Sequence, residues 1–351
     1  MTIQVSFMRI AHVVWSLMVG GLETMLVNII NEQVKTEDVE LFIVNDQYFE
    51  PLLQKLSPKC NVIFCRRKEG SRNPLPLIKL NIWLWRYSPD IVHVHSYRLS
   101  DIIYDRRRMV RTIHNTKNKC REYYRMKALY SISGSVREYT LKQGFDSVVI
   151  ENGIPTRSIR KKREYNIHNN CYQLVQVSRL CIAQKGQDIL IKAVDILVHQ
   201  RNITNFILHL IGDGESRQEL QQMVSDFCLE EYVVFEGIKT QEYLFEHLAD
   251  YDCFIQPSRF EGFGLTTAEA IAAKLPVLVS NIEGPLEIIE NGRVGMTFET
   301  ENPDDLADKL EFILKGRYDY TLTDKAYERV VNRYDVSVTA QKYIQEYKKI
   351  V

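Results

Sequence analysis

The sequence alternates short, almost uninterrupted apolar runs with segments of helical periodicity, and it does so twice along the chain. Strands that are apolar on both faces are typical of a parallel sheet covered by helices on both sides. In the first half we expect strands over 8–15, 40–45, 61–65, 91–95, 109–113, 129–133 and 148–150, and helices over 22–33 and 75–87. This pattern predicts a doubly wound α/β domain.

A polar, charged segment over 151–170 interrupts the alternation and reads as a linker. A second set of expected strands follows at 172–178, 205–211, 232–235, 252–256 and 276–280, with helices at 185–200, 215–228, 241–249, 265–273, 284–290 and 303–316. An amphipathic helix is expected over 337–349. We therefore predict two doubly wound domains, 1–155 and 165–335, and a C-terminal helix within 336–351.

The composition fits a two-domain globular protein and excludes several classes. The 351 residues suffice for two ordinary cores, and the longest apolar runs are shorter than the roughly 20 residues of a membrane span. The seven cysteines are an odd number and form no CxxC pair, which disfavours disulfides or zinc and favours a reducing cytoplasm.

The formal net charge of zero hides an asymmetry between the two halves. Residues 1–170 hold 27 Lys and Arg against 16 Asp and Glu, and the remainder holds 18 against 29, so the balances are +11 and −11. Basic and aromatic residues interleave at 83–87, 106–108 and 117–127. Two interpretations stay open: contact with an anionic membrane surface, or a solvated face with the tryptophans in the core. Nucleic acid is the weaker interpretation, because no nucleic-acid-binding motif is present.

The densest chemical signal is the loop and helix between Glu261 and Glu269. A helix that starts near Leu265 offers free N–H groups and a partial positive charge, which suit a phosphate. Gly262 and Gly264 permit close approach of the backbone. Glu269, one turn into the helix, can accept from two adjacent hydroxyls such as those of a ribose. Glu261 can bind hydroxyls of another group on the same ligand.

These residues resemble the Glu-x7-Glu motif of family-4 retaining glycosyltransferases with the GT-B fold, and the resemblance covers essentially the whole chain. It implies two Rossmann-like domains that face a central cleft, with the C-terminal helix returning to the first domain. It further implies that Glu261 binds the donor sugar, that Glu269 binds the ribose, and that the backbone of 263–265 (Phe263, Gly264 and Leu265) binds the diphosphate.

Three further elements match the family. Arg179 and Lys185, in the segment 177–194, would neutralise the diphosphate leaving group, where negative charge develops. Gly20 and Gly21 resemble the glycine-rich loop near the donor. His114, just past an expected strand, resembles the histidine near the donor sugar, where it would bind a hydroxyl or assist an oxocarbenium-like transition state. Among the other histidines, His95 is the best placed to touch acceptor.

Two further motifs resemble ligand-binding patterns but are weaker evidence for a binding site. Asp250-Tyr251-Asp252 is a DxD, the metal-binding pattern of the other large glycosyltransferase class, but here it leads into an expected strand. Gly212-Asp213-Gly214 lacks a GxGxxG or a P-loop pattern. In the family that the chain resembles, the DxD segment is structural and no metal is used, so the resemblance implies that neither a metal nor a cofactor is needed.

The resemblance implies a hexosyltransferase-type enzyme that moves a sugar from a nucleotide-diphosphate sugar to a hydroxyl of a glycan or lipid-linked acceptor, with retention. A UDP-sugar is the favoured donor and surface polysaccharide assembly the favoured setting, with a cytoplasmic location, peripheral on the inner face of the membrane if the basic half binds lipid. The alternatives are a GT-B sugar-nucleotide epimerase or phosphorylase, and a non-catalytic nucleotide-sugar-binding subunit.

Overall fold

The computed structural model describes residues 7–18, 20–96, 98–114, 123–165 and 171–351. The chain divides into two compact units. Unit 1 comprises 1–154 together with 334–351, and unit 2 comprises 155–333. No helix within the described residues combines the length and the apolar character needed to cross a bilayer.

Unit 1 contains a seven-stranded parallel sheet with the strand order β3-β2-β1-β4-β5-β6-β7. Its strands are β1 Arg9–Val14, β2 Asp38–Asn45, β3 Asn61–Arg67, β4 Ile91–Val94, β5 Met109–Ile113, β6 Ala128–Ser131 and β7 Val148–Val149. Its helices are α1 Gly21–Gln33, α2 Glu50–Leu53, α3 Leu75–Tyr87, α4 Leu99–Ile102, α5 Gly134–Lys142 and α14 Val336–Lys348, with a 3-10 turn η1 at Tyr123–Arg125. The predicted doubly wound parallel sheet is confirmed for this half of the chain.

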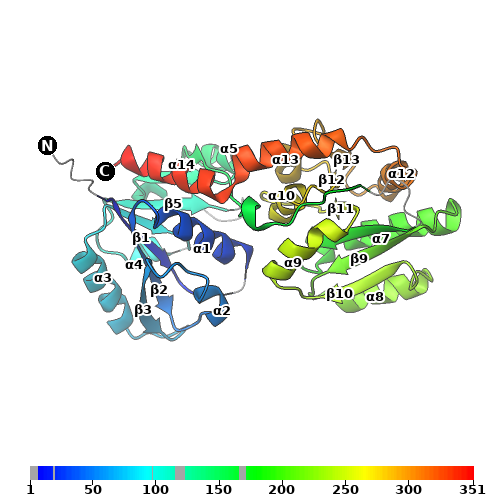
Figure 1. Ribbon diagram of the computed structural model, residues 1–351. Coiled ribbons are helices and arrows are strands. Elements are labelled where there is room, and N and C mark those ends of the chain that lie inside the picture. The colour runs from blue at the N-terminus through cyan, green and yellow to red at the C-terminus, as the bar shows by residue number, and fades with distance from the viewer. Residues whose placement is uncertain (1–6, 19, 97, 115–122, 166–170) are drawn as a thin grey trace. The chain divides into compact units, whose positions relative to one another are not determined.

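Alternate residues of β1 face two separate apolar cores in unit 1. Ile10 and Val14 pack in one core with α1 and α14, whereas Ala11 and Val13 pack in the other with α3 and α4. Successive side chains of a strand point to opposite faces, so one strand can serve both cores. Helices α1 and α14 lie side by side on the first face (Figure 1).

Unit 2 contains a six-stranded parallel sheet with the strand order β10-β9-β8-β11-β12-β13. Its strands are β8 Tyr172–Val177, β9 Phe206–Ile211, β10 Val233–Gly237, β11 Cys253–Gln256, β12 Val277–Ser280 and β13 Met296–Phe298. Its helices are α6 Ile182–Lys185, α7 Gln187–Asp195, α8 Arg217–Asp226, α9 Gln241–His247, α10 Leu265–Ala272, α11 Glu283–Ile288, α12 Pro303–Leu314 and α13 Thr321–Tyr334. Short turns are η2 Thr156–Ser158, η3 Ile196–Gln200 and η4 Leu248–Asp250. This second parallel sheet confirms the predicted fold class.

The structure corrects the single helix expected over 185–200. The chain forms α6, breaks at Gly186, forms α7 and ends in the π-helical turn η3. Gly186 has a φ of 65°, in the left-handed region, and therefore ends one helix and caps the next. The break places Lys185 at the end of α6, beside the loop that follows β11.

Candidate functional site

The loop between β11 and α10 carries Glu261 and is held in place by polar contacts from its own strand and helix. Gln256, the last residue of β11, donates from Nε2 to Glu261 Oε2 at 3.0 Å. Its Oε1 accepts a hydrogen bond from Thr267 Oγ1 in α10. The buried Gln256 amide therefore couples the start of the loop to the helix and orients the Glu261 carboxylate between them.

Lys185 meets Glu261 directly. Its Nζ lies 2.5 Å from Glu261 Oε2, and both side chains are only 17% exposed. The adjacent Gly186 explains how the two segments come so close, because a Cβ at this position would lie 1.9 Å from the carbonyl oxygen of Pro257. Only glycine permits this approach, and it also supplies the left-handed φ.

Arg259 fastens the same loop to α7. Its two terminal nitrogens contact Asp188 Oδ1 and Oδ2 at 2.7 and 2.9 Å, a bidentate ion pair. On the other side of the loop, a Cβ at Gly284 would lie 2.9 Å from the carbonyl oxygens of Glu261 and Phe263. The loop is thus fixed from both sides, by a charged clamp and by close backbone packing on α11.

Helix α10 begins after Gly264, whose φ of 100° favours glycine. Gly264 is the N-cap residue and makes no side-chain cap bond. The first N–H groups of any helix lack intrahelical partners, and here no cap side chain covers them. This end of α10 can therefore accept an anionic group.

Glu269 lies one turn into α10 and is 8% exposed. Burial raises the pKa of Glu269 to about 7, although a hydrogen bond from the Gln241 side chain at the start of α9 opposes that rise. A carboxyl group with this pKa exists in both protonation states near neutral pH. It can therefore accept from hydroxyl groups when ionised and donate when protonated.

Arg179 follows β8, the neighbour of β11 in the sheet, so both loops leave the same sheet edge. Gln187 Nε2 donates to the Arg179 carbonyl at 2.9 Å and to Ser178 Oγ at 3.0 Å. The guanidinium contacts the Gln184 side chain at 3.5 Å, and its charge also acts on the nearby Glu215 carboxylate. The backbone of this segment is anchored, and the Arg179 residue is exposed.

The Gly212-Asp213-Gly214 loop after β9 packs on this segment. A Cβ at Gly212 would lie 2.0 Å from the Ser178 carbonyl oxygen, and one at Gly214 would lie 2.4 Å from that of Leu180. Asp213 is paired with Arg217 at 3.0 Å. These glycines therefore have a packing explanation that needs no ligand.

The DxD carboxylates are both bound to groups of the protein. Asp250 pairs with Arg160 and with His247. Asp252 lies 3.0 Å from Lys162 Nζ and accepts from the Gln173 backbone N–H at 2.9 Å. These contacts give the motif a structural role at the start of β11.

In unit 1, the predicted Gly20 and Gly21 stand at the start of α1. Gly20 is the N-cap residue in an extended conformation, with a φ of −175°, and makes no side-chain cap bond. A Cβ there would meet the Glu23 carboxylate at 2.3 Å, and this carboxylate is the far end of a flexible side chain. The backbone geometry alone does not demand glycine at Gly20.

His114 follows β5 and lies near His93 and His95. Burial, with a smaller contribution from the Arg111 charge, lowers the pKa of His114 to about 4. Its Nδ1 is buried and has no hydrogen-bond partner among the described residues. The ring is therefore neutral at physiological pH and suits a hydrogen-bonding role better than that of a general acid.

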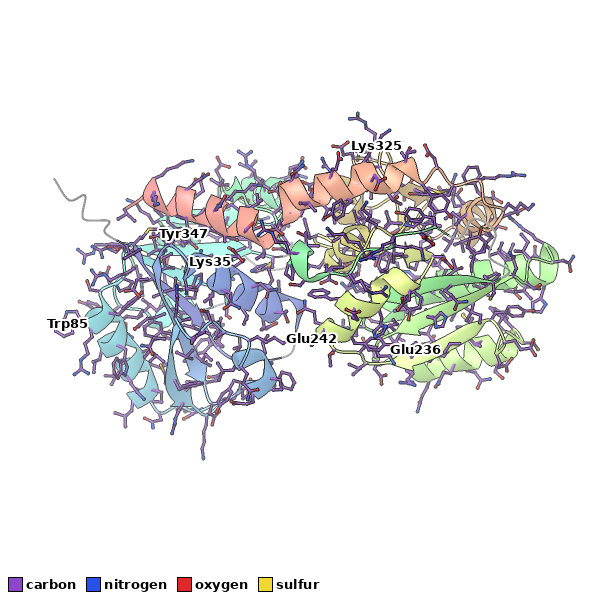
Figure 2. The ribbon with its side chains drawn as sticks, viewed as in Figure 1. Lys35, Trp85, Glu236, Glu242, Lys325 and Tyr347 are labelled. Carbon is purple, nitrogen blue, oxygen red and sulfur yellow. The ribbon has the colours of Figure 1, made fainter. Side chains whose placement is uncertain are left out.

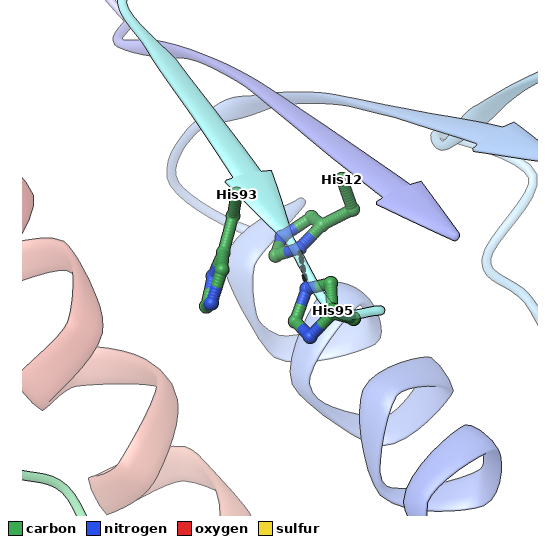
Figure 3. Close-up of side chains that lie close together, drawn as sticks. All are labelled: His12, His93 and His95. Carbon is green, nitrogen blue, oxygen red and sulfur yellow. Dashed lines mark hydrogen bonds between the residues drawn. The ribbon is translucent and has the colours of Figure 1, made fainter. Parts of the chain in front are cut away.

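Three further histidines lie together on β1 and at the end of β4 (Figure 3). His12 Nδ1 is 2.8 Å from His95 Nε2, and His12 Nε2 is 2.7 Å from Gln33 Oε1. His93 uses both nitrogens as well, toward Tyr347 OH at 2.6 Å and toward Thr112 Oγ1 at 2.9 Å.

The ligand atoms of these three imidazoles lie within 4.8 Å of one another, a spacing that could hold a metal ion. A metal would have to replace hydrogen bonds that already satisfy both nitrogens of His12 and of His93. An unpaired buried polar group is costly, so we interpret the cluster as a hydrogen-bond network that ties α14 to the sheet.

Two family models match adjacent parts of the chain. Residues 19–158 match Glycosyltransferase Family 4, and residues 158–332 match Glycosyl transferases group 1. The chain belongs to glycosyltransferase family 4. The residues around Glu261, Lys185 and Glu269 are thus the candidate functional site of a glycosyltransferase.

Several curated relatives align with this glycosyltransferase. WclY of Escherichia coli, an O-antigen biosynthesis glycosyltransferase, is 26% identical over 376 residues, which covers 98% of this chain and 99% of that protein. The poly(ribitol-phosphate) alpha-N-acetylglucosaminyltransferase of Staphylococcus aureus (strain COL) is 29% identical over 170 residues, 48% of this chain and 34% of that enzyme. The sucrose synthase of Denitrovibrio acetiphilus is 35% identical over 147 residues, 38% of this chain and 19% of that enzyme. The chain thus spans about a third or less of the length of the last two relatives.

Solved structures support the fold. HepE of Anabaena, solved in complex with UDP and glucose, has a TM-score of 0.78 at 20% identity, covering 97% of this chain and 99% of that one. A glycosyltransferase from Rickettsia africae ESF-5 has a TM-score of 0.77 at 19% identity, covering 98% of both chains. The fold of this glycosyltransferase is therefore GT-B, as the resemblance implied.

Sequence reasoning missed the side chains that hold the predicted residues. Gln256 and Gln241 bind the two motif glutamates, and Arg259 clamps the loop. One signal pointed to Gln256, since a polar residue that ends the buried run Cys253–Gln256 needs a partner. Gln241 carries no such signal, because its contact joins two elements that are distant in sequence.

Proposed function

We propose that this glycosyltransferase moves a sugar from a nucleotide-diphosphate sugar, with a UDP-sugar favoured, to a hydroxyl of a glycan or lipid-linked acceptor. We further propose that the anomeric configuration is retained and that no metal takes part. HepE, which was solved with UDP, and the relative in O-antigen biosynthesis favour this donor and this class of acceptor.

The contact between Lys185 and Glu261 carries the proposal. Glu261 would bind hydroxyls of the donor sugar, and Lys185 would bind the leaving phosphate. Their charged groups are paired at 2.5 Å, so both lie close enough together to contact a donor at the bond between its sugar and its phosphate. A fixed cation beside that bond stabilises the negative charge that develops on the departing diphosphate.

The rest of the donor would extend along α10. The uncapped N–H groups that follow Gly264 would hold the diphosphate, and Glu269 would accept from the ribose hydroxyls. Arg179 would supply a second cation to the leaving group. Two cations and a helix N-terminus supply the positive charge that a metal ion supplies in other transferases, which supports a metal-independent reaction.

Transfer begins when the acceptor hydroxyl approaches the anomeric carbon as the sugar–phosphate bond breaks. The proton of that hydroxyl passes to the departing diphosphate, so the acceptor oxygen gains the sugar and the nucleoside diphosphate leaves. We propose that His114, neutral and with an unpartnered Nδ1 among the described residues, binds a sugar hydroxyl near this reaction. Bilayer contact by the basic first half would bring a lipid-linked acceptor within reach.

Donor binding is tested by thermal shift with UDP, GDP, ADP and their sugars in the presence of EDTA. A nucleotide at about 100 times its Kd should stabilise the folded protein by about 2.7 kcal/mol. The shift should survive EDTA and be lost in Glu269→Ala.

Slow donor hydrolysis, in which water replaces the acceptor, should fall about 100-fold in Lys185→Ala, because a charge-stabilising group is removed.

Lys309→Ala is the matched control, since Lys309 is 40% exposed on α12, outside the proposed donor site, and its replacement should leave both readouts unchanged. A shift that requires a divalent metal would contradict metal independence. Tight donor binding without any hydrolysis or transfer would instead favour a non-catalytic subunit, and release of a changed sugar nucleotide would favour an epimerase.

A further inference from the structure

Helix α3 presents an apolar stripe to solvent. The α3 stripe consists of Leu75, Ile78, Ile82 and Trp85, which are spaced three, four and three residues apart and so lie on one face of the helix. Their exposed fractions are 65%, 50%, 44% and 79%. Figure 2 shows Trp85 at the outer edge of the ribbon, directed away from it.

Among the described residues of unit 1, neither hydrophobic core includes the four side chains of this stripe. Helix α3 packs on the sheet through Leu80 and Leu84, on its opposite side. Tyr104, which is 92% exposed, is held beside α3 by its backbone, because its N–H donates to Asn81 Oδ1 at 2.7 Å. A contiguous exposed apolar surface of this kind marks an interaction site more often than a scattered residue does.

Positive charge surrounds the α3 stripe. The segment 66–88 contains six basic residues and one acidic residue, a balance of +5. Five of the basic residues are exposed: Arg66, Lys68, Arg72, Lys79 and Arg86. The acidic side chains near Tyr104 are paired with arginines, Asp105 with Arg107 and Asp101 with Arg125. In the segment that contains α3, exposed basic side chains therefore outnumber exposed acidic ones.

We propose that the α3 stripe docks on an anionic lipid bilayer. Tryptophan, isoleucine and leucine on one face of a helix, flanked by lysine and arginine, fit the boundary between acyl chains and negatively charged headgroups. A second copy of the chain fits less well, because a two-fold contact through this face would oppose its cations to themselves. The inference adds to the proposed function by placing the protein on the surface that would hold a lipid-linked acceptor.

The test is co-sedimentation of the full chain with phosphatidylcholine vesicles, with and without phosphatidylglycerol. Wild type should bind only the vesicles that contain phosphatidylglycerol. Ile82→Ser/Trp85→Ser should lower the partition coefficient by about tenfold or more, because its apolar side chains no longer enter the interface. Lys79→Gln/Arg86→Gln should lower it by roughly fivefold for each cation removed.

Ile238→Ser is the matched control, since Ile238 is 77% exposed in unit 2 and its replacement should leave vesicle binding unchanged. Circular dichroism checks that each variant is folded. Three results would overturn the proposal: equal binding to neutral vesicles, no binding to either kind, or self-association that Ile82→Ser/Trp85→Ser abolishes. The nucleotide thermal shift, measured on the same variants, separates a failure of docking from a failure of the proposed donor site.

Discussion

At the scale of single residues, Glu269 is a candidate ligand-binding group whose ionised form destabilises the folded protein. Its carboxyl is buried, and burial raises its pKa from 4.5 to about 7. The folded protein therefore binds this proton more tightly than the unfolded chain does. The stability that the protonated group contributes is fully present below pH 4.5 and is lost as the pH rises to about 7.

This pKa predicts a pH-dependent effect of Glu269→Gln. Ionisation of Glu269 should cost about 3 kcal/mol of unfolding free energy above the folded pKa. The glutamine variant, which stays neutral, should therefore be more stable than wild type at about pH 8 and show a smaller difference at about pH 5. Urea unfolding of both proteins at both pH values measures this difference in stability. An equal difference at the two pH values would mean that other groups of the folded protein stabilise the ionised carboxylate.

At the scale of elements, the site depends on how closely two loops approach. The end of α6 and the loop after β11 meet where Gly186 lies against the Pro257 carbonyl, and this contact brings Lys185 to Glu261. The ion pair between Lys185 and Glu261 thus depends on the absence of a side chain at Gly186.

Gly186→Ala should separate these loops. A Cβ at Gly186 would lie 1.9 Å from the Pro257 oxygen and would also strain a φ of 65°. Gly237→Ala is the matched control, because its φ is 69° but no atom lies within 4 Å of the added Cβ. The control should lose about 1 kcal/mol from backbone strain alone.

Gly186→Ala should lose more stability than that control, together with nucleotide binding. Denaturant unfolding and the nucleotide thermal shift measure the two effects. Equal losses of stability in the two variants would contradict the importance of the close approach.

The helices and strands differ in how well the sequence predicts them. Long apolar strands such as β1 and β2 were predicted because nearly every residue in them is buried. The strand β13 was missed because three residues carry no period, and α5 was missed because Val136 is the one buried apolar residue among its described side chains. The break at Gly186 was missed because it depends on a carbonyl some seventy residues away in the chain.

The candidate site was predictable to a similar degree. Glu261, Glu269, Arg179 and Lys185 could be proposed because local motifs carry them. The contact between Lys185 and Glu261 joins two such motifs, and the sequence alone gives no distance between them. Gly20 and His114 remain predictions about ligand contact.

At the scale of the whole molecule, the two units have separate hydrophobic cores. The core of unit 2 and the two cores of unit 1 share no member among the described residues. The three tryptophans, at 15, 83 and 85, all belong to unit 1. Tryptophan fluorescence therefore reports the unfolding of unit 1, whereas far-UV circular dichroism reports both units.

A nucleotide bound to unit 2 should shift only part of the thermal transition. We expect UDP to raise the midpoint of a component seen by circular dichroism and to leave the tryptophan fluorescence midpoint in place, because separate cores can unfold independently. Wild type with and without UDP, followed by both signals in one scan, provides the measurement. Equal shifts in both signals would mean that the units unfold as one.

The placement of α14 also bears on synthesis at the ribosome. Tyr343 and Tyr347 of α14 are built into the core of unit 1, and Tyr347 is hydrogen-bonded to His93. This helix emerges only after all of unit 2 has been translated. Domains generally fold in order from the N-terminus. Here unit 2 can complete its fold before unit 1, because unit 1 lacks α14 until the end of translation. That helix is encoded more than 180 codons after β7.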